Sequence, residues 1–141
     1  MVSDPLESRL GYLLKHVQAE LARTSAEALA PYGMDGHDLA VLVVLAGAEP
    51  LSQIELAGRM AVDRTTMVAL LDRLERRGLV ERRRSPQDRR RNIVELTDAG
   101  RERMGRAEEA RRAAERRFLA PLDDATVATL VGALRALLPD R

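Results

Sequence analysis

The sequence of 141 residues contains no cysteine and no tryptophan, and it has only two histidines. Without cysteine, the chain forms no disulfides, thiolate metal sites or iron–sulfur clusters, and it cannot sense peroxide through a thiol. His16 and His37 leave little material for a zinc enzyme, because His37 has only Asp38 beside it and no third ligand nearby. We therefore expect no metal ion and no other cofactor.

Aromatic residues and long apolar runs are also scarce. No run approaches the roughly 20 apolar residues of a membrane span, and the first residues lack the basic start and apolar stretch of a signal peptide. We therefore expect a cytoplasmic protein without a membrane partner. One phenylalanine and two tyrosines leave the core to Leu, Val, Ala and Met, which favours helices over a β-sandwich. The length suits one domain, residues 1–141.

The formal net charge is only +1, but the basic residues are concentrated in one segment. Residues 59–91 hold eleven arginines against five acids, an excess of six positive charges that leaves −5 for the rest of the chain. A basic segment in an acidic chain favours a surface that binds a polyanion such as nucleic acid. An ordinary solvated surface is the alternative. Lys15 is the sole lysine, so arginine richness alone does not decide between them.

Apolar spacing and capping residues predict a mainly helical chain. Ser52 and Glu55 fit a capping box at the start of one short helix, and Asp63 is the expected N-cap of the next. In that second helix, Met67, Leu70, Leu71 and Leu74 form the expected buried stripe. The expected helices cover about residues 6–29, 39–45, 53–59, 64–77 and 98–119, with a last one after the cap Asp123.

Residues 79–84 and 92–96 instead alternate like strands, and a turn over 85–88 predicts that they pair as a hairpin. Arg89, Arg90 and Arg91 lie at or near its tip. Two short helices followed by a basic hairpin are typical of a winged helix-turn-helix. The expected fold is mainly α with a small two-stranded β wing. A core of about residues 35–97 would be flanked by dimerisation helices over about 5–30 and 98–139.

This order of elements suits DNA. A helix fits the major groove, where each base pair presents a distinct pattern of donors and acceptors, and an arginine-tipped hairpin reaches the adjacent minor groove. The alternative for Arg73, Arg76 and Arg77 is a solvated helix face paired with Asp72 and Glu75. The expected DNA contacts are Ser52, Gln53, Arg64, Thr65, Thr66, Val68, Ala69, Arg73, Arg89, Arg90 and Arg91.

Three stretches of the sequence resemble the MarR family of bacterial transcriptional regulators: residues 52–57, residues 62–82, and the wing signature Asp88-x-Arg90 followed by Leu96-Thr97-x-x-Gly100. The resemblance implies a homodimeric repressor that a small, commonly phenolic ligand releases from DNA. It also implies that residues 63–77 form the recognition helix, that Arg90 enters the minor groove and that Asp88 braces the wing. Many members have an arginine where this chain has Ala69, so base readout is expected to shift towards Arg64, Thr65 and Thr66.

The two ends of the chain carry more apolar surface than one small winged domain can cover. Pairing these ends across a two-fold axis predicts a homodimer, with Leu6, Leu10, Leu130, Leu134 and Leu137 in the interface.

A phenolic or aromatic-acid effector is expected between the dimerisation helices and the winged domain, near Tyr12, His16, Tyr32 and His37. The alternative is that these four side chains only fill gaps and cap helix ends.

The leading hypothesis is a sequence-specific, ligand-responsive repressor that binds a pseudo-palindromic operator as a homodimer. A sequence-tolerant architectural DNA-binding protein would use the same wing, and a helical interaction protein would use the basic face to bind an acidic partner. No nucleophile–base pair, phosphate-binding loop or metal cluster is recognisable in the sequence, so an enzyme is not expected.

Overall fold

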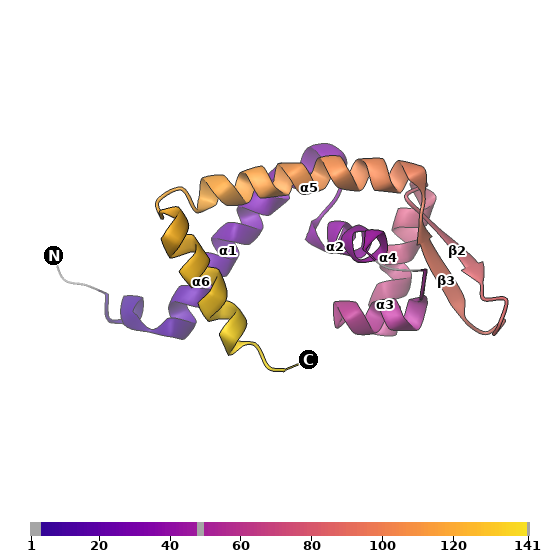
Figure 1. Ribbon diagram of the computed structural model, residues 1–141, viewed down its shortest axis with the longest axis horizontal. Helices are drawn as coiled ribbons and strands as arrows, with labels where there is room; N and C mark the ends of the chain where they lie inside the picture. The colour runs from indigo at the N-terminus through magenta and orange to yellow at the C-terminus, as the bar shows by residue number, and fades with distance from the viewer. Residues whose placement is uncertain (1–3, 48–49, 141) are drawn as a thin grey trace.

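A long helix joins two limbs of an arch in the computed structural model, which describes residues 4–47 and 50–140 (Figure 1). Helix α5 forms the top of the arch, α1 and α6 form one limb, and the other limb holds α2, α3, α4 and the strands. The elements are η1 (Pro5–Ser8), α1 (Leu10–Leu29), η2 (Ala30–Tyr32), α2 (Gly36–Ala46), β1 (Leu51–Ser52), α3 (Gln53–Met60), α4 (Arg64–Arg76), β2 (Val80–Arg84), β3 (Asn92–Leu96), α5 (Asp98–Phe118) and α6 (Asp124–Leu137). The mainly helical, winged fold is confirmed.

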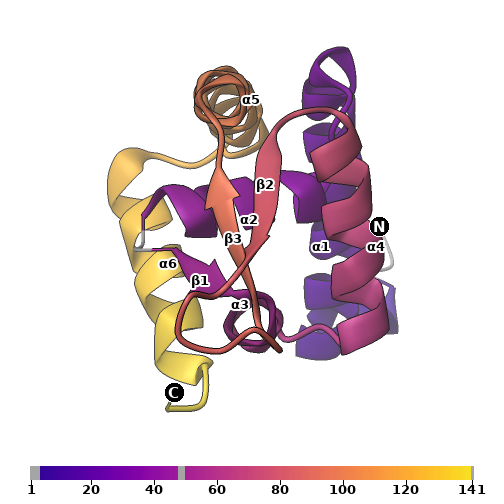
Figure 2. The same cartoon turned by 90° about the vertical axis from the view of Figure 1, so that its right-hand side faces the viewer.

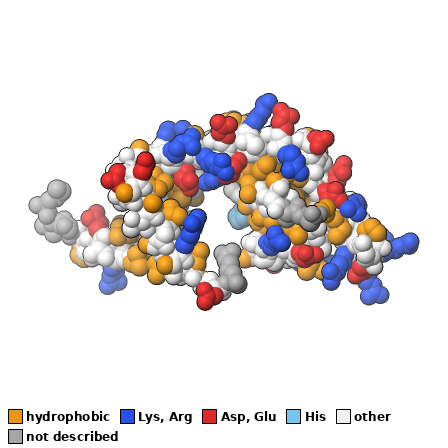
Figure 3. Space-filling model, in the orientation of Figure 1, with side chains coloured by type: hydrophobic (Ala, Val, Ile, Leu, Met, Phe, Trp, Pro, Cys, Tyr) orange, Lys and Arg blue, Asp and Glu red, His pale blue; other side chains and the backbone are white. Residues whose placement is uncertain are grey.

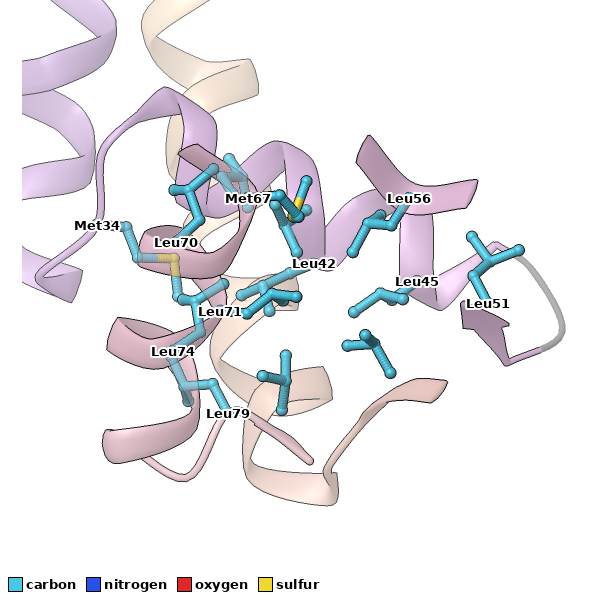
Figure 4. Close-up of a cluster of buried hydrophobic side chains, with 14 of the residues drawn as sticks. Met34, Leu42, Leu45, Leu51, Leu56, Met67, Leu70, Leu71, Leu74 and Leu79 are labelled. Carbon is cyan, nitrogen blue, oxygen red and sulfur yellow. The ribbon is translucent and has the colours of Figure 1, made fainter. Parts of the chain in front are cut away.

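The core lies inside the second limb, where α2, α3 and α4 converge on the sheet (Figure 4). The apolar stripe of α4 is buried as expected, with Met67, Leu71 and Leu74 fully inaccessible. Leu42 of α2 and Leu56 of α3 are equally inaccessible. Burying such side chains stabilises a fold by roughly 1.5–3 kcal/mol each, so this cluster fixes the position of α4 in the limb.

The sheet has three strands instead of the expected two. Its order is β1-β3-β2 with antiparallel pairing, and Figure 2 views the strands from the winged end. In β2 and β3, Val80 pairs with Leu96 and Arg84 pairs with Asn92, which confirms the hairpin. The additional strand β1 has two residues, and its Leu51 pairs with Val94. So short a strand has no periodicity in sequence, and it forms because β3 offers it a free edge.

Local chemistry at the helix ends differs from the expectation in three places. The first helix begins at Leu10, because Asp4 and Pro5 start a separate 3₁₀ turn over Pro5–Ser8. At α3, Ser52 Oγ accepts the N–H of Glu55 at 3.1 Å, but the return bond of a capping box is not among the bonds formed there. A complete capping box instead starts α2, between Asp35 and Asp38.

A tight joint connects the base of the sheet to the start of α5. The Thr97 side chain donates to the carbonyl of Gly78 at 2.6 Å and accepts the N–H of Gly100 at 2.9 Å. At Gly100, a Cβ atom would lie 2.0 Å from the carbonyl oxygen of Leu79, so only glycine permits this approach. The winged limb is therefore joined closely to the long helix.

The face of α5 near α1 and α2 carries an ion-pair network that we expect to give acid-dependent stability. Hydrogen bonds from Arg111 at 2.8 and 3.0 Å lower the pKa of Glu108 from its ordinary value of 4.5. A lowered folded-state pKa means that the stabilisation is complete above the unfolded-state value and is lost as the pH falls through the folded-state value. As the pH falls from about 6 to about 3, the free energy of unfolding should decrease in both proteins. The decrease should be about 1 kcal/mol smaller in Glu108→Gln than in wild type.

Urea unfolding at a series of pH values measures this difference. The matched control is Glu102→Gln, which removes a carboxylate from the exposed pair with Arg106 and should follow wild type. Equal acid sensitivity of Glu108→Gln and wild type would contradict a stabilising role for the Glu108–Arg111 pair.

Within residues 4–47 and 50–140, none of the helices combines the length and the apolar character that crossing a membrane requires.

Candidate nucleic-acid interface

Helix α4 presents one face to the core and the opposite face to solvent. Asp63 caps its N-terminus by accepting the N–H of Thr66 at 2.7 Å, which lowers the pKa of the Asp63 carboxyl. The preceding turn bends sharply because Ala61 adopts a left-handed conformation with φ 53°. With its apolar stripe buried, the helix leaves Arg64, Thr65, Thr66 and Ala69 exposed and Val68 half-buried.

The loop of the wing is organised by its own short hydrogen bonds. Buried Ser85 accepts the N–H groups of Gln87 and Asp88 through its Oγ, at 3.2 and 3.3 Å. Asp88 Oδ1 accepts the N–H of Arg90 at 3.0 Å, and its Oδ2 lies 3.6 Å from Nε of Arg91. Asp88 thus holds the loop in a form that keeps the Arg90 side chain exposed.

Arg82 of β2 connects the wing to α4. Its Nη2 lies 2.5 Å from Asp72 Oδ1 and 3.0 Å from Glu75 Oε1, and its backbone N–H donates to Glu75 Oε2 at 2.9 Å. These bonds lower the pKa of Glu75. Asp72 and Glu75 therefore pair across to the sheet, and not with the arginines of their own helix as the solvated-face alternative supposed. In the sequence, Arg82 is the last residue of the stretch 62–82 that resembles the MarR family, but no role was assigned to it there.

Five of the expected DNA contacts border one hollow of about 380 Å³ between α3, the start of α4 and the base of the wing, and the buried Ser52 is one of them. Gln53 comes from α3, Arg64 from α4, and Arg90 and Arg91 from the wing loop. Figure 3 shows the cationic groups at the winged end of the arch. The fold thus gathers basic residues from separate elements on one surface.

Ser52 and Arg73 have other contacts. The Ser52 side chain is buried and caps α3, so it serves the fold and is not accessible to a ligand. Arg73 Nη2 lies 2.6 Å from the buried carboxylate of Asp38. Ser52 therefore borders the hollow only as a buried group, and Arg73 is not part of its wall.

A second cavity, of about 330 Å³, lies where α1, α2 and α5 meet, at the position expected for an effector. The four ring-bearing residues do not line it. Tyr12 and His16 contact each other near the N-terminal end of α1, with ring centroids 4.1 Å apart and the rings tilted by 41°. Tyr32 is half-buried against the core, and His37 is exposed at the start of α2. The cavity wall is made by Ser25, Leu29, Gly36, Leu39, Ala40, Val43, Glu108 and Arg111.

Comparison with known proteins identifies the family. The MarR family model matches residues 32–91, which include α2, α3, α4, β2 and the loop of the wing. An HTH-type transcriptional repressor of Mycobacterium tuberculosis is 37% identical over 116 residues, which cover 82% of this chain and 84% of that protein. This chain belongs to the MarR family. As a member, it is a DNA-binding transcriptional regulator and not an enzyme.

Solved MarR-type structures share the arch over almost its whole length. The transcriptional repressor CouR bound to a 23-mer DNA duplex is 33% identical, with a TM-score of 0.91 and 97% of each chain covered. CouR from Rhodococcus jostii RHA1 bound to p-coumaroyl-CoA is 30% identical, with a TM-score of 0.84 and 99% of each chain covered. The fold of this MarR protein is therefore one that occurs both with DNA and with an aromatic thioester.

Proposed function

We propose that this MarR protein is a homodimeric repressor that binds a pseudo-palindromic operator and responds to a small aromatic effector. The observation that carries the proposal is the gathering of Arg64, Arg90 and Arg91 around one hollow, beside the exposed face of α4. In this arrangement α4 enters the major groove and the wing follows the adjacent minor groove. The protein would act in the cytoplasm, where its operator is.

The dimer is supported by α6, in which no residue is buried. Its apolar side chains include Leu130 at 39% exposure and Leu134 at 41%. Leu10 of α1 is 63% exposed. The two helices cross in Figure 1, but Figure 2 places them on opposite sides of α5, so they do not cover each other. A second copy with the same surface would cover both apolar faces, and Leu6 and Leu137 would join the interface.

Base readout is proposed for the first turn of α4. We expect Arg64→Ala, Thr65→Ala and Thr66→Ala each to change the preferred operator sequence as well as the affinity, by about 1–3 kcal/mol at a base that the side chain contacts. Selection of duplexes from a randomised pool, repeated with each variant, measures this preference. Arg101→Ala on exposed α5 is the matched control and should select the wild-type sequence.

The same selection tests the proposed function itself. A wild-type consensus with dyad symmetry supports a sequence-specific repressor. Binding without any consensus would instead identify a sequence-tolerant architectural protein. No binding even at low salt would exclude both, because phosphate contacts are strongest there.

For the effector, we propose the cavity between α1, α2 and α5, where Leu29, Leu39 and Val43 offer an apolar wall for an aromatic ring. A ligand that fits one spacing of the two winged limbs better than another would release DNA. Titrating salicylate-like compounds against the protein–operator complex tests this, with Ala40→Phe to fill the cavity. If the compounds release operator DNA equally well from Ala40→Phe and from wild type, the effector binds elsewhere. His16→Ala and Tyr32→Ala should release DNA like wild type, since neither side chain lines this cavity.

A further inference from the structure

The α1–α2 connector, defined as the segment 30–35 together with the first turn of α2 up to Asp38, receives three arginines from other elements. Arg73 comes from the C-terminal half of α4, Arg77 is the C-cap that follows α4, and Arg103 comes from α5. The connector links a dimerisation helix to the winged limb, and α4 is the helix proposed to enter DNA. Contacts at the connector therefore help to set the angle between α4 and the dimerisation helices α1 and α6.

The first contact is an ion pair with a buried partner. Nη2 of Arg73 lies 2.6 Å from Asp38 Oδ1, and the Asp38 side chain is only 6% exposed whereas that of Arg73 is 49% exposed. The other oxygen of Asp38 accepts the N–H of Asp35 at 3.0 Å, so the carboxylate is fixed from two sides. The hydrogen bond from Arg73 to Asp38 also raises the pKa of the guanidinium. A guanidinium held in this way is not directed at a phosphate.

The second contact is made by Arg77, the C-cap of α4. Its guanidinium donates to the carbonyls of Gly33 and Tyr32, and Arg103 donates to the same Tyr32 carbonyl at 3.3 Å. Gly33 has φ +66°, and a Cβ atom there would lie 2.7 Å from Nη2 of Arg77. Glycine at this position thus leaves the space that the guanidinium occupies.

From these two contacts we infer that Arg73 and Arg77 are positioning residues that hold α4 to the α1–α2 connector. The inference rests on the proposed function in one respect. By fixing α4 relative to the dimerisation helices, the contacts of Arg73 and Arg77 set the spacing of half-sites that the dimer accepts. It removes Arg73 from the set of DNA contacts. Asp38 becomes a residue of the DNA-binding machinery although its buried carboxylate cannot reach DNA.

The two roles of Arg73 predict opposite effects of Asp38→Asn. If Arg73 contacted phosphate, removal of the Asp38 charge would free the arginine and strengthen binding to a polyanion. If Arg73 is a positioning residue, Asp38→Asn and Arg73→Ala each weaken operator binding by about tenfold, and the double variant is no weaker than either one. The amide oxygen of asparagine can still accept the N–H of Asp35, and Arg73 is half-exposed, so both variants should fold.

Operator affinity is measured on the selected duplex and on duplexes with one base pair added or removed between the half-sites, at several salt concentrations. The positioning role predicts that Arg73→Ala discriminates less between spacings, that Arg73→Lys restores discrimination, and that the salt slope is unchanged. A slope reduced by about 0.9, the value for one lost phosphate contact, would overturn it, as would tighter binding by Asp38→Asn.

A measurement without DNA keeps this inference separate from the proposed function. The chain has no cysteine, so spin labels at Lys15→Cys on α1 and Glu81→Cys on β2 report one distance within a chain that is diluted with unlabelled protein. We expect Arg73→Ala and Asp38→Asn to broaden this distance distribution. Arg76→Ala should leave it unchanged, because the Arg76 side chain donates to a carbonyl of its own helix.

If the spin-label distance distributions of Arg73→Ala and Asp38→Asn are as narrow as that of wild type, Arg73 is not a positioning residue. If the variants broaden the distribution but the wild type selects no operator, the positioning role of Arg73 is supported and the proposed operator-binding repressor fails.

Discussion

Leu134→Asp is expected to convert the dimer into monomers and to abolish operator binding at concentrations where wild type binds. Among residues 4–47 and 50–140, no residue of α6 is buried, and Leu134 lies on its apolar face, 41% exposed, in the C-terminal half of the helix. An aspartate there would be buried against the partner without a counter-charge, which costs several kcal/mol. The dimer dissociation constant should therefore rise by at least about a hundredfold.

Sedimentation equilibrium measures the dissociation constant, and a titration with operator follows the loss of binding. Ala136→Asp is the matched control, because the period of the helix places Ala136 on the side of α6 opposite Leu134. It should remain a dimer. A wild-type protein that sediments as a monomer at micromolar concentration would contradict the dimer itself.

Arg90→Ala is expected to weaken operator binding by about 1–3 kcal/mol, which corresponds to about 5- to 150-fold in affinity. The side chain is exposed in the wing loop and has no part in the core. Asp88 bonds the backbone N–H of residue 90, which the substitution leaves in place, so the loop should keep its form. The loss is thus expected in DNA affinity without a change in thermal stability.

Fluorescence anisotropy with labelled operator at physiological salt measures the affinity, and circular dichroism melting checks the fold. Arg101→Ala removes the same charge from α5, away from the basic surface, and should bind almost like wild type. Affinity of Arg90→Ala equal to wild type would contradict the assignment of the wing to the minor groove.

Most local features of this fold follow from chemistry within a few residues. Asp63, Thr97 and Asp123 cap helices as expected, because each accepts an N–H three residues ahead. The stripe of α4 is buried because leucine and methionine recur with the helical period. Helix caps and apolar periodicity depend only on residues close together in the sequence, so they can be predicted without knowing the tertiary fold.

The parts that sequence reasoning missed depend on partners far along the chain. Arg73 pairs with Asp38, 35 residues away, and nothing near either residue predicts the other. The four ring-bearing side chains expected near an effector do not gather at one place in the chain. Tyr12 lies in the first turn of α1, whereas Tyr32 lies in η2, beyond the C-terminal end of that 20-residue helix, which at about 1.5 Å per residue is roughly 30 Å long.

A footprint of the protein on the DNA upstream of its own gene tests the central claim most directly. Two symmetric half-sites, centred about one helical turn of roughly 10 base pairs apart, should be protected at a stoichiometry of one dimer per site. Within each half-site the protection should cover a major groove and the minor groove beside it. Uniform weak protection along the fragment, or protection of a single half-site by a monomer, would contradict the account.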